Sequence, residues 1–375
     1  SFTTCTSKAL GAYAMTSPSS GVAPRRATVV GLGLIGASVS LALRERDWGV
    51  TGVDADTVRA NEALSVGAVD ALGYDAEADL VVVAVPVSSI AAAVLTALEA
   101  CPGAVVTDVG SVKGPVVAAM SDGRFVGGHP MAGSEQEGLS GADAALFSGA
   151  TWVLTPTERT NASAHAAVRQ VVASLGADVV ELAPERHDEL VALVSHVPHL
   201  AAATLMGIAA SSAEEHATLL RLAAGGFRDM TRIAAGHPGI WPDICAENGD
   251  AIVAGLTTFV SALEEIRAVV AAGDRTALLD RLERARAARV NLPARLAAAD
   301  DLVEMRIPVP DRPGVLAEVT TLASDLDVNI VDLEIAHSAE GDRGVLVIVV
   351  DSKAADLMRG ALLARAYRPS VAALS

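Results

Sequence analysis

The amino-acid sequence predicts an α/β domain with a parallel sheet, then an all-helical domain, then a small β-α-β-β-α-β domain. Short apolar strands alternate with Ala-rich helical stretches up to about residue 183. Residues 184–299 show a 3.6-residue apolar period with few β-branched clusters, and strand patterns return at residue 302. The predicted domains are therefore 25–183, 184–299 and 302–375. Residues 1–24, rich in Ser, Thr, Gly and Ala, are expected to form a flexible tail.

Size and composition exclude several classes of protein. The chain has 375 residues, 51% of them hydrophobic, and its 45 acidic and 28 basic side chains give a formal charge of −17. So acidic a chain, without a stripe of Lys and Arg, is not expected to bind nucleic acid or an anionic membrane surface. Cys5, Cys101 and Cys245 are far apart, so we expect neither disulfides nor a metal site. Uninterrupted apolar runs fall short of the roughly 18 to 20 residues of a membrane span, which predicts a cytoplasmic protein.

The first strand, 27–30, leads into the turn Gly31-Leu32-Gly33-Leu34-Ile35-Gly36 and a helix to about residue 46. The next strand, 49–53, ends on Asp54. In this context the glycines allow a tight turn and a close backbone approach to pyrophosphate, while the acid accepts hydrogen bonds from ribose hydroxyls. Because an acidic residue would repel a 2′-phosphate, the pattern predicts a Rossmann-type domain that binds NAD rather than NADP. A glycine turn without a ligand is the disfavoured alternative.

Candidate catalytic residues follow later strands of the predicted sheet, at the edge where open α/β sheets bind their ligands. Asp108 and Ser111 come after the strand at 105–107. Ser111 could donate or accept a hydrogen bond at a reacting centre, although a serine there is commonly a helix cap. His129 lies in a glycine-flanked loop, 127–135, and could hydrogen-bond a hydroxyl whose carbon loses hydride. Its alternative is a turn histidine without a role. The other strands are expected at 80–85, near 126 and at 151–154.

Two histidines stand out in the helical domain. His196 and His199 are three residues apart, so they share a face if the stretch is helical. Because unpaired histidines are costly to bury, we expect them to line a polar cavity. Histidines satisfied by backbone groups are a fair competitor, and a metal site would need a third ligand that the sequence does not offer.

Two arginines, Arg228 and Arg232, lie four residues apart in a run where Asp229 is the one other charged residue. Arg232, which precedes Ile233, Ala234 and Ala235, is expected to be the more buried. A partly buried arginine usually marks a bidentate carboxylate partner. On the sequence alone, that partner is equally a substrate carboxylate or an internal one such as Asp229 or Asp243.

The C-terminal residues follow the order of a ferredoxin-like domain. Strand 302–309 is followed by the turn 310–314 and a helix to about residue 326. Strands at 328–336 and 344–350, a helix at 354–366 and a short final strand complete the pattern.

In this order, these motifs resemble the prephenate and arogenate dehydrogenase family of tyrosine biosynthesis. The matching stretches are Gly31 to Ser38, Asp108 to Gly114, Gly127 to Glu135, Ser195 to His199, and Gly226 to Ala234 with Trp241 and Asn248. The resemblance implies that the helical domain forms a homodimer. Residues 302–375 look like an ACT domain, which typically binds an amino acid.

The resemblance also implies a reaction: NAD-dependent oxidative decarboxylation of prephenate to 4-hydroxyphenylpyruvate, CO2 and NADH. The alternative is an arogenate (cyclohexadienyl) dehydrogenase that gives tyrosine directly. His129 would accept the proton of the ring hydroxyl, assisted by Ser111, and Arg232 and His199 would hold the substrate. The remaining pocket residues would be His196, Ser134, Glu135 and Trp241. The residues that contact NAD would be Gly31, Gly33, Leu34, Ile35, Gly36, Asp54, Val85, Pro86 and Asp108.

For the C-terminal domain we expect an effector, tyrosine or another amino acid, near the first helix. A helix N-terminus offers backbone N–H groups to a carboxylate. The expected contacts are Asp311, Gly314, Val315, Leu316, Asn329 and Ile330. The alternative is a domain that only extends the dimer.

Two further functions are alternatives to the one that the resemblance implies. A β-hydroxyacid dehydrogenase would carry a catalytic lysine in its helical domain, and residues 185–300 contain none. A non-catalytic sensor of NAD and an amino acid would bind both ligands without turnover. The set of Ser111, His129, His199 and Arg232 argues against the sensor.

Overall fold

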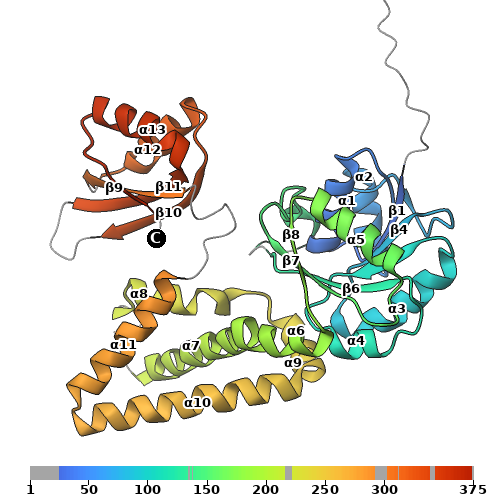
Figure 1. The fold of residues 1–375 in the computed structure, drawn as a ribbon, viewed down its shortest axis with the longest axis horizontal. Coiled ribbons are helices and arrows are strands. Elements are labelled where there is room, and N and C mark those ends of the chain that lie inside the picture. Colours follow the sequence, from blue (N-terminus) through green and yellow to red (C-terminus); the bar gives the residue numbers. More distant parts are fainter. Residues whose placement is uncertain are drawn as a thin grey trace, which may run out of the picture.

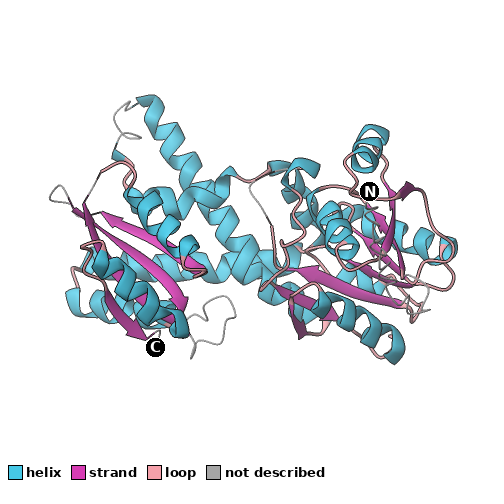
Figure 2. Ribbon diagram, turned by 90° about the horizontal axis from the view of Figure 1, so that it is seen from above, coloured by secondary structure: helices cyan, strands magenta, loops and turns pink. Residues whose placement is uncertain are grey.

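A computed structural model describes residues 25–133, 136, 138–215, 222–291, 302–310, 312–337 and 343–373. The predicted tail 1–24 and the candidate site residues Ser134, Glu135 and Asp311 lie outside the described residues. The described chain forms an α/β domain, a helical domain and a small C-terminal domain (Figure 1). Viewed from above, the helical domain lies between the two domains that contain sheets (Figure 2).

The α/β domain is built on an eight-stranded sheet in the order β3-β2-β1-β4-β5-β6-β7-β8. Neighbouring strands are parallel except for β6 and β7, which are antiparallel. The strands are β1 (Arg26–Val30), β2 (Gly49–Val53), β3 (Ala71–Leu72), β4 (Leu80–Val83), β5 (Val105–Asp108), β6 (Phe125–Pro130), β7 (Thr151–Thr155) and β8 (Asp178–Glu181). The helices are α1 (Leu34–Arg44), α2 (Thr57–Ser65), α3 (Val87–Ala100), α4 (Gly114–Ala118) and α5 (Ala162–Ser174), with a 3₁₀ turn at Leu139–Gly141.

Two hydrophobic cores cover the two faces of this sheet. One contains residues of α1 and α5, and the other contains residues of α3 and α4. Strand β4 is buried along its whole length, which explains its uninterrupted run of Leu and Val. Because β1 pairs with β2 on one side and with β4 on the other, the strand order reverses beside β1. Ligands bind at such a reversal, outside the carboxyl ends of the strands.

The helical domain begins with one continuous helical stretch that contains a π-helix. The elements are α6 (Pro184–Val191), the π-helix Ala192–His196, α7 (Val197–Glu215), α8 (Gly225–Thr231), α9 (Trp241–Glu247), α10 (Gly249–Ala272) and α11 (Arg275–Val290), with 3₁₀ turns at Arg232–Ala235 and Pro238–Ile240. The small core of this domain also includes Val112 from the turn between β5 and α4. The helical domain therefore packs directly against the sheet edge where ligands are expected.

One helical stretch, Pro184–Ser212, is long and apolar enough to cross a membrane by length and composition alone. The uninterrupted apolar runs within it are shorter, because polar residues such as His196, His199 and Thr204 interrupt them. Core helices of soluble proteins pass the same test. The first turns of this stretch carry the buried polar residues His187 and Asp188.

The C-terminal domain has the predicted β-α-β-β-α-β order. Its elements are β9 (Leu302–Pro310), α12 (Val315–Asp325), β10 (Ile330–His337), β11 (Arg343–Asp351), α13 (Ser352–Ala364) and β12 (Ser370–Ala373). The sheet order is β10-β11-β9-β12 and all neighbours are antiparallel. Alternate residues of β9 and β11 join residues of both helices in one core. The predicted fold class is confirmed.

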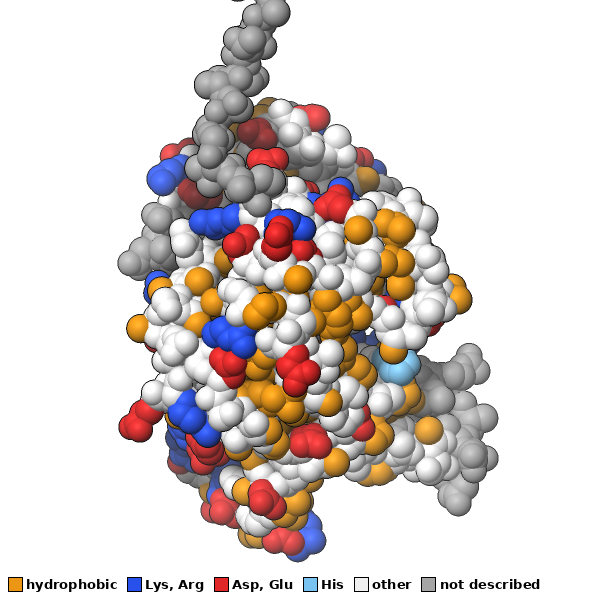
Figure 3. Space-filling view, turned by 90° about the vertical axis from the view of Figure 1, so that its right-hand side faces the viewer, with side chains coloured by type: hydrophobic (Ala, Val, Ile, Leu, Met, Phe, Trp, Pro, Cys, Tyr) orange, Lys and Arg blue, Asp and Glu red, His pale blue; other side chains and the backbone are white. Residues whose placement is uncertain are grey.

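Charged side chains on the α/β domain lie next to opposite charges. Arg26 pairs with Asp75 and Glu77, and Arg44 pairs with Asp70. On the face of the molecule shown in Figure 3, Lys and Arg side chains stand among Asp and Glu, with a band of hydrophobic side chains between them.

Candidate active site

The glycine turn after β1 fits a pyrophosphate. Gly31 has a φ of +92°, and a Cβ there would lie 2.3 Å from the carbonyl oxygen of Ala84. A Cβ on Gly36 would lie 1.8 Å from the oxygen of Gly31, so neither position accepts a side chain. A Cβ on Gly33 would meet nothing within 4 Å, which shows open space above the turn. Helix α1 begins at Leu34, and the free N–H groups of its first turn favour an anion.

Asp54 lies directly after β2 with its carboxylate turned back to the glycine turn. Its Oδ2 accepts from the backbone N–H of Leu32 at 2.8 Å, and its Oδ1 accepts from the backbone N–H of Asp56 at 2.8 Å. The guanidinium of Arg59 lies 3.3 Å from Oδ1. These contacts fix the orientation of the carboxylate beside the glycine turn. Val85 follows β4 beside Gly31, and Pro86 is the N-cap residue of α3.

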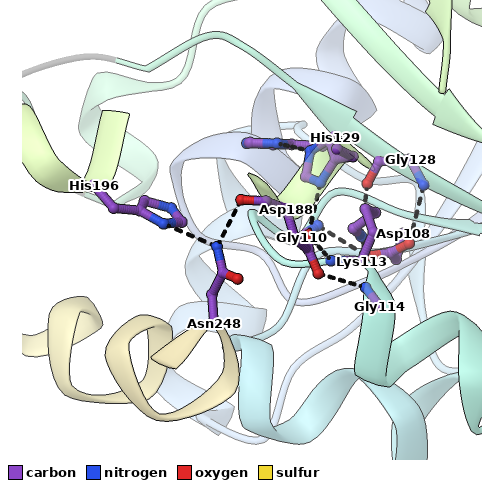
Figure 4. Close-up of polar contacts among 10 residues, drawn as sticks. Asp108, Gly110, Lys113, Gly114, Gly128, His129, Asp188, His196 and Asn248 are labelled. Carbon is purple, nitrogen blue, oxygen red and sulfur yellow. Dashed lines mark hydrogen bonds and ion pairs between the residues drawn. The ribbon is translucent and has the colours of Figure 1, made fainter. Parts of the chain in front are cut away.

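A buried ion pair joins the ends of β5 and β6 (Figure 4). The Lys113 ammonium contacts Asp108 Oδ2 and donates to the carbonyl of Gly128 at 2.9 Å. Asp108 also accepts from the backbone N–H groups of Gly110 at 2.9 Å and Gly128 at 3.1 Å. Both charged side chains are fully buried. Burial lowers the pKa of Lys113, and the carboxylate of Asp108 opposes that shift. The pair fixes the strand that carries His129.

His129 is the first member of a chain of hydrogen bonds. Its Nδ1 lies 2.8 Å from Nε2 of His187, whose Nδ1 lies 2.8 Å from Oδ1 of Asp188. The Asp188 carboxylate also accepts from the backbone N–H groups of Lys113 at 2.8 Å and Gly114 at 2.7 Å. Burial lowers the pKa of His129 well below its ordinary value, helped by the neighbouring His187 and Lys113.

These hydrogen bonds indicate which nitrogen of each ring carries the proton. A carboxylate oxygen only accepts, so His187 donates from Nδ1, and in the neutral ring of His187 Nε2 then accepts. His129 therefore donates from Nδ1, and its Nε2 carries a free lone pair. The second nitrogen of His129 is thus a base and not a donor.

His196 carries its proton on the other ring nitrogen, Nε2. The side-chain amide of Asn248 donates to the carbonyl of Asp188 at 3.0 Å and lies 3.3 Å from Nδ1 of His196. Since the amide nitrogen only donates, Nδ1 accepts and Nε2 carries the proton. Burial lowers the pKa of His196 to about 4, so the ring is neutral at pH 7. Its Nε2 is buried without a hydrogen-bond partner among the described residues, so it is a donor available to a ligand.

Trp241, at the start of α9, brings the two predicted histidines together. The ring of His199 stacks on the indole, with centroids 3.6 Å apart, and the ring of His196 meets it edge-on at 6.0 Å. Burial lowers the pKa of His199. The α/β and helical domains are joined nearby, where Ser88 in α3 donates to Asp243 in α9 at 2.7 Å.

The alternative interpretation of Ser111 as the cap of α4 was wrong, because the N-cap residue is Lys113, and Ser111 lies half-buried in the turn after β5. The placement of His129 in a loop was also wrong, because His129 lies in strand β6. Arg232, which was expected to be partly buried, is exposed in this chain, and so is Arg228. The apolar residue beside it, Ile233, is itself 38% exposed, so the flanking sequence marks a surface and not a core.

Comparison with known proteins adds a family to this geometry. The nucleotide-binding domain profile of prephenate dehydrogenase matches residues 39–181, and the dimerization domain profile of prephenate dehydrogenase matches residues 183–284. A prephenate dehydrogenase of Bacillus subtilis (strain 168) is 34% identical over 343 residues, which cover 86% of this chain and 91% of that protein. The chain belongs to the prephenate dehydrogenase family.

Two solved structures of the family have the same fold. Prephenate dehydrogenase from A. aeolicus, in complex with hydroxyphenyl propionate and NAD+, has a TM-score of 0.68 and 28% identity. The matched region covers 73% of this chain and 100% of the A. aeolicus chain. The arogenate dehydrogenase of Synechocystis has a TM-score of 0.62 and 31% identity, and it covers 70% of this chain and 98% of that chain.

Three polar residues of the site have no role among the expectations from the sequence: Lys113, His187 and Asp188. The segment from Glu185 to Glu189 has five charged or titratable side chains in succession, which is typical of a solvated helix end. The signal that could have found them is the spacing of Pro184 and Val191, seven residues apart. That spacing puts His187 and Asp188 on the buried face between them.

Among the described residues, no group of three or more His, Cys, Asp or Glu side chains could hold a metal ion.

Proposed function

We propose that this chain is a cytoplasmic prephenate dehydrogenase that converts prephenate and NAD to 4-hydroxyphenylpyruvate, CO2 and NADH in tyrosine biosynthesis. The observation that carries the proposal is the acceptor nitrogen of His129. This residue lies near the carboxyl end of β6, at the same edge of the sheet as the glycine turn after β1. A base beside a dinucleotide site is what the oxidation of a ring alcohol needs.

The chain contributes orientation and charge placement to this reaction. NAD, when bound, supplies the hydride acceptor. His129 Nε2 accepts the hydrogen bond of the ring hydroxyl and its proton as the hydroxyl becomes a carbonyl. Ser111, in the turn after β5, assists at the same hydroxyl. Loss of CO2 restores an aromatic ring, so alignment of the carbon–hydrogen bond is the main task of the protein.

The substrate is a dianion, and the histidines that would contact it are neutral. The lowered pKa values of His129, His196 and His199 favour their uncharged forms. His196 donates from Nε2 to a substrate oxygen, and His199 and Trp241 form a flat wall. Arg232 supplies the positive charge that holds a carboxylate, against a chain of formal charge −17. Ser134 and Glu135 complete the proposed pocket.

A simple assay tests the reaction. With NAD present, prephenate should raise the absorbance of NADH at 340 nm. Changing His129→Asn should lower kcat by about 100-fold or more, with a smaller effect on KM. His165→Gln, a change on α5 beside Glu181 and remote from the site, should leave both constants unchanged. Absence of turnover despite NAD binding would refute the proposal and favour the sensor.

Arogenate is the alternative substrate, and the similarity to the Synechocystis arogenate dehydrogenase supports testing it. Arogenate carries an amine where prephenate carries a keto group, so the ring chemistry is unchanged. Parallel assays with both substrates decide between them. A higher kcat/KM for arogenate would keep the mechanism and change the substrate.

A homodimer is the proposed assembly. Large apolar side chains are exposed along one set of helices in the helical domain: Ile208, Val253, Val260, Leu263, Ile266, Val270, Leu279 and Leu282. Large apolar side chains that are exposed in such numbers usually face a partner. Sedimentation analysis should give twice the 38.1 kDa mass of the chain. Ile266→Asp with Val270→Asp should produce a monomer, whereas a monomeric unmodified chain would contradict the proposal.

For the C-terminal domain we propose an ACT-type effector site for tyrosine. Gly314 has a φ of +91° and Val315 begins α12, so the first-turn N–H groups open beside the turn. Leu316 lies in the first turn of α12, whereas Asn329 and Ile330 lie at the opposite end of this helix, where β10 begins. Tyrosine should bind by calorimetry and inhibit turnover, and Leu316→Ala should weaken both effects. Inhibition without any change in Leu316→Ala would place the effector elsewhere.

A further inference from the structure

His187 and Asp188 lie behind His129, on the side away from its free Nε2. His187 is fully buried, and it contacts His129 through one ring nitrogen and Asp188 through the other. The ring planes of the two histidines are 74° apart, so the imidazoles meet edge to face and not as a stack. His187 and Asp188 belong to α6, the first helix of the helical domain, whereas His129 belongs to the sheet.

We propose that His187 and Asp188 are positioning residues that act through His129 as a temporary proton store during turnover. The inference rests on the proposed function. As Nε2 of His129 takes the hydroxyl proton, the proton on Nδ1 of His129 moves to Nε2 of His187. The positive charge then lies on His187, against the Asp188 carboxylate, and not on His129.

The balance of atoms and charges requires that the hydroxyl proton is held in the site and then returned, and not released to solvent. The ring carbon gives its hydrogen with both electrons to NAD, and the hydroxyl oxygen gives its proton to His129. The bond to the ring carboxylate then breaks, CO2 leaves, and its electron pair enters the ring to form a phenolate. The phenolate takes the proton back. A dianion and a nicotinamide cation become a monoanion and a neutral nicotinamide, so no net proton is released.

The burial of His129 explains why a second histidine is needed. Its imidazolium form is strongly disfavoured, because burial and the neighbouring Lys113 lower its pKa. His187 differs because it contacts a carboxylate. Asp188 is itself held by two backbone N–H groups at the start of α4, so the carboxylate is oriented before the substrate arrives.

The positions of the histidine protons before substrate binds can be tested without turnover. In ¹⁵N-histidine NMR spectra, His129 and His187 should both carry their proton on Nδ1, and His196 should carry it on Nε2. The chain has eight histidines, and single His→Gln variants assign the signals. A proton on Nε2 of either His129 or His187 would overturn the proposal, whatever the substrate proves to be.

Turnover is tested with His187→Gln, with His165→Gln as the matched control on the α/β domain. The glutamine side chain introduced by His187→Gln keeps an acceptor for His129 but takes up no proton. We expect kcat to fall by about 100-fold, with KM within about 2-fold and unchanged thermal unfolding. The solvent deuterium effect on kcat should rise and the effect of deuterium at the reacting carbon should fall. His165→Gln should change none of these, and turnover of either prephenate or arogenate by the unmodified chain confirms the proposed chemistry separately.

His187→Ala separates proton storage from packing. Imidazole added to this variant should restore at least about 10-fold of the lost kcat, whereas thiazole, a ring of the same size but far weaker basicity, should not. Equal rescue by both rings would show that His187 only fills space. Rescue by neither ring, together with an unchanged solvent isotope effect in His187→Gln, would also overturn the proposal.

Discussion

The imidazole of His199 lies almost parallel to the indole of Trp241, with 12° between the planes and 3.6 Å between the centroids. An aromatic contact of this kind contributes about 0.5–1.5 kcal/mol. Trp241→Ala should therefore raise KM for prephenate by about 2- to 10-fold and change kcat less. Substrate titration should also change the fluorescence of Trp241, and Trp241→Phe should abolish that change. A Trp48→Phe control, in the core of the α/β domain, should retain it.

The buried pair of Lys113 and Asp108 should be costly to break from one side. Lys113→Met leaves the Asp108 carboxylate buried without its counter-charge, so the free energy of unfolding should fall by about 3–5 kcal/mol. Arg186→Met, which breaks an exposed pair with Glu189, should cost about 1 kcal/mol or less. Urea unfolding measures both. An equal fall in the free energy of unfolding in the two variants would show that burial does not make the Lys113–Asp108 pair costlier to break.

The neutral histidines make stability depend on pH. In the folded chain, the pKa of His196 is about 4, below its ordinary value of 6.5. The unfolded chain therefore binds more protons between these values, and the free energy of unfolding should fall as pH drops from about 6.5 to 4. His129, whose pKa is also lowered, acts in the same direction. Urea midpoints at several pH values should be less sensitive to pH in His196→Gln. Equal stability of the unmodified chain at pH 7 and 5 would contradict this.

Asp54 should decide the choice between NAD and NADP. Removing its carboxylate in Asp54→Ser loses charged hydrogen bonds worth about 1.5–3 kcal/mol, so KM for NAD should rise by about 10- to 100-fold. Arg59, 3.3 Å from Asp54, becomes available to a 2′-phosphate. Turnover with NADP should therefore increase. An unchanged ratio of kcat/KM for the two cofactors would place the ribose elsewhere.

Local patterns explain how much of this molecule could be predicted from its sequence. The glycine turn and Asp54 lie within one strand-turn-helix-strand unit, so their spacing alone identifies them. His196 and His199 were found because histidines are rare on an apolar helix. Their contact with Trp241, 42 residues beyond His199, depends on packing that no local pattern encodes.

The remaining site residues depend on contacts between domains. A lysine such as Lys113 is expected on the surface. It is buried because β6 lies beside β5, where the carbonyl of Gly128 accepts from its ammonium. His187 and Asp188 lie in a charged segment, and they are buried because α6 packs against the start of α4. Arg232 was misjudged for the converse reason, because its apolar neighbours lie on the surface of this chain.

The π-helix at Ala192–His196 has a consequence for insertions and deletions. Each residue of an α-helix turns the chain by about 100°, and a π-turn holds one more residue than an α-turn. A π-turn therefore takes up one extra residue without changing the direction of the side chains that follow it. Removing a single amino acid between positions 192 and 196 would restore an α-turn and leave His199 on the indole and Ile208 on the outward surface of α7. The same deletion between His199 and Ile208 would rotate every side chain beyond it by about 100°. The π-turn is thus the place in this helical stretch where the loss of one residue should be tolerated best.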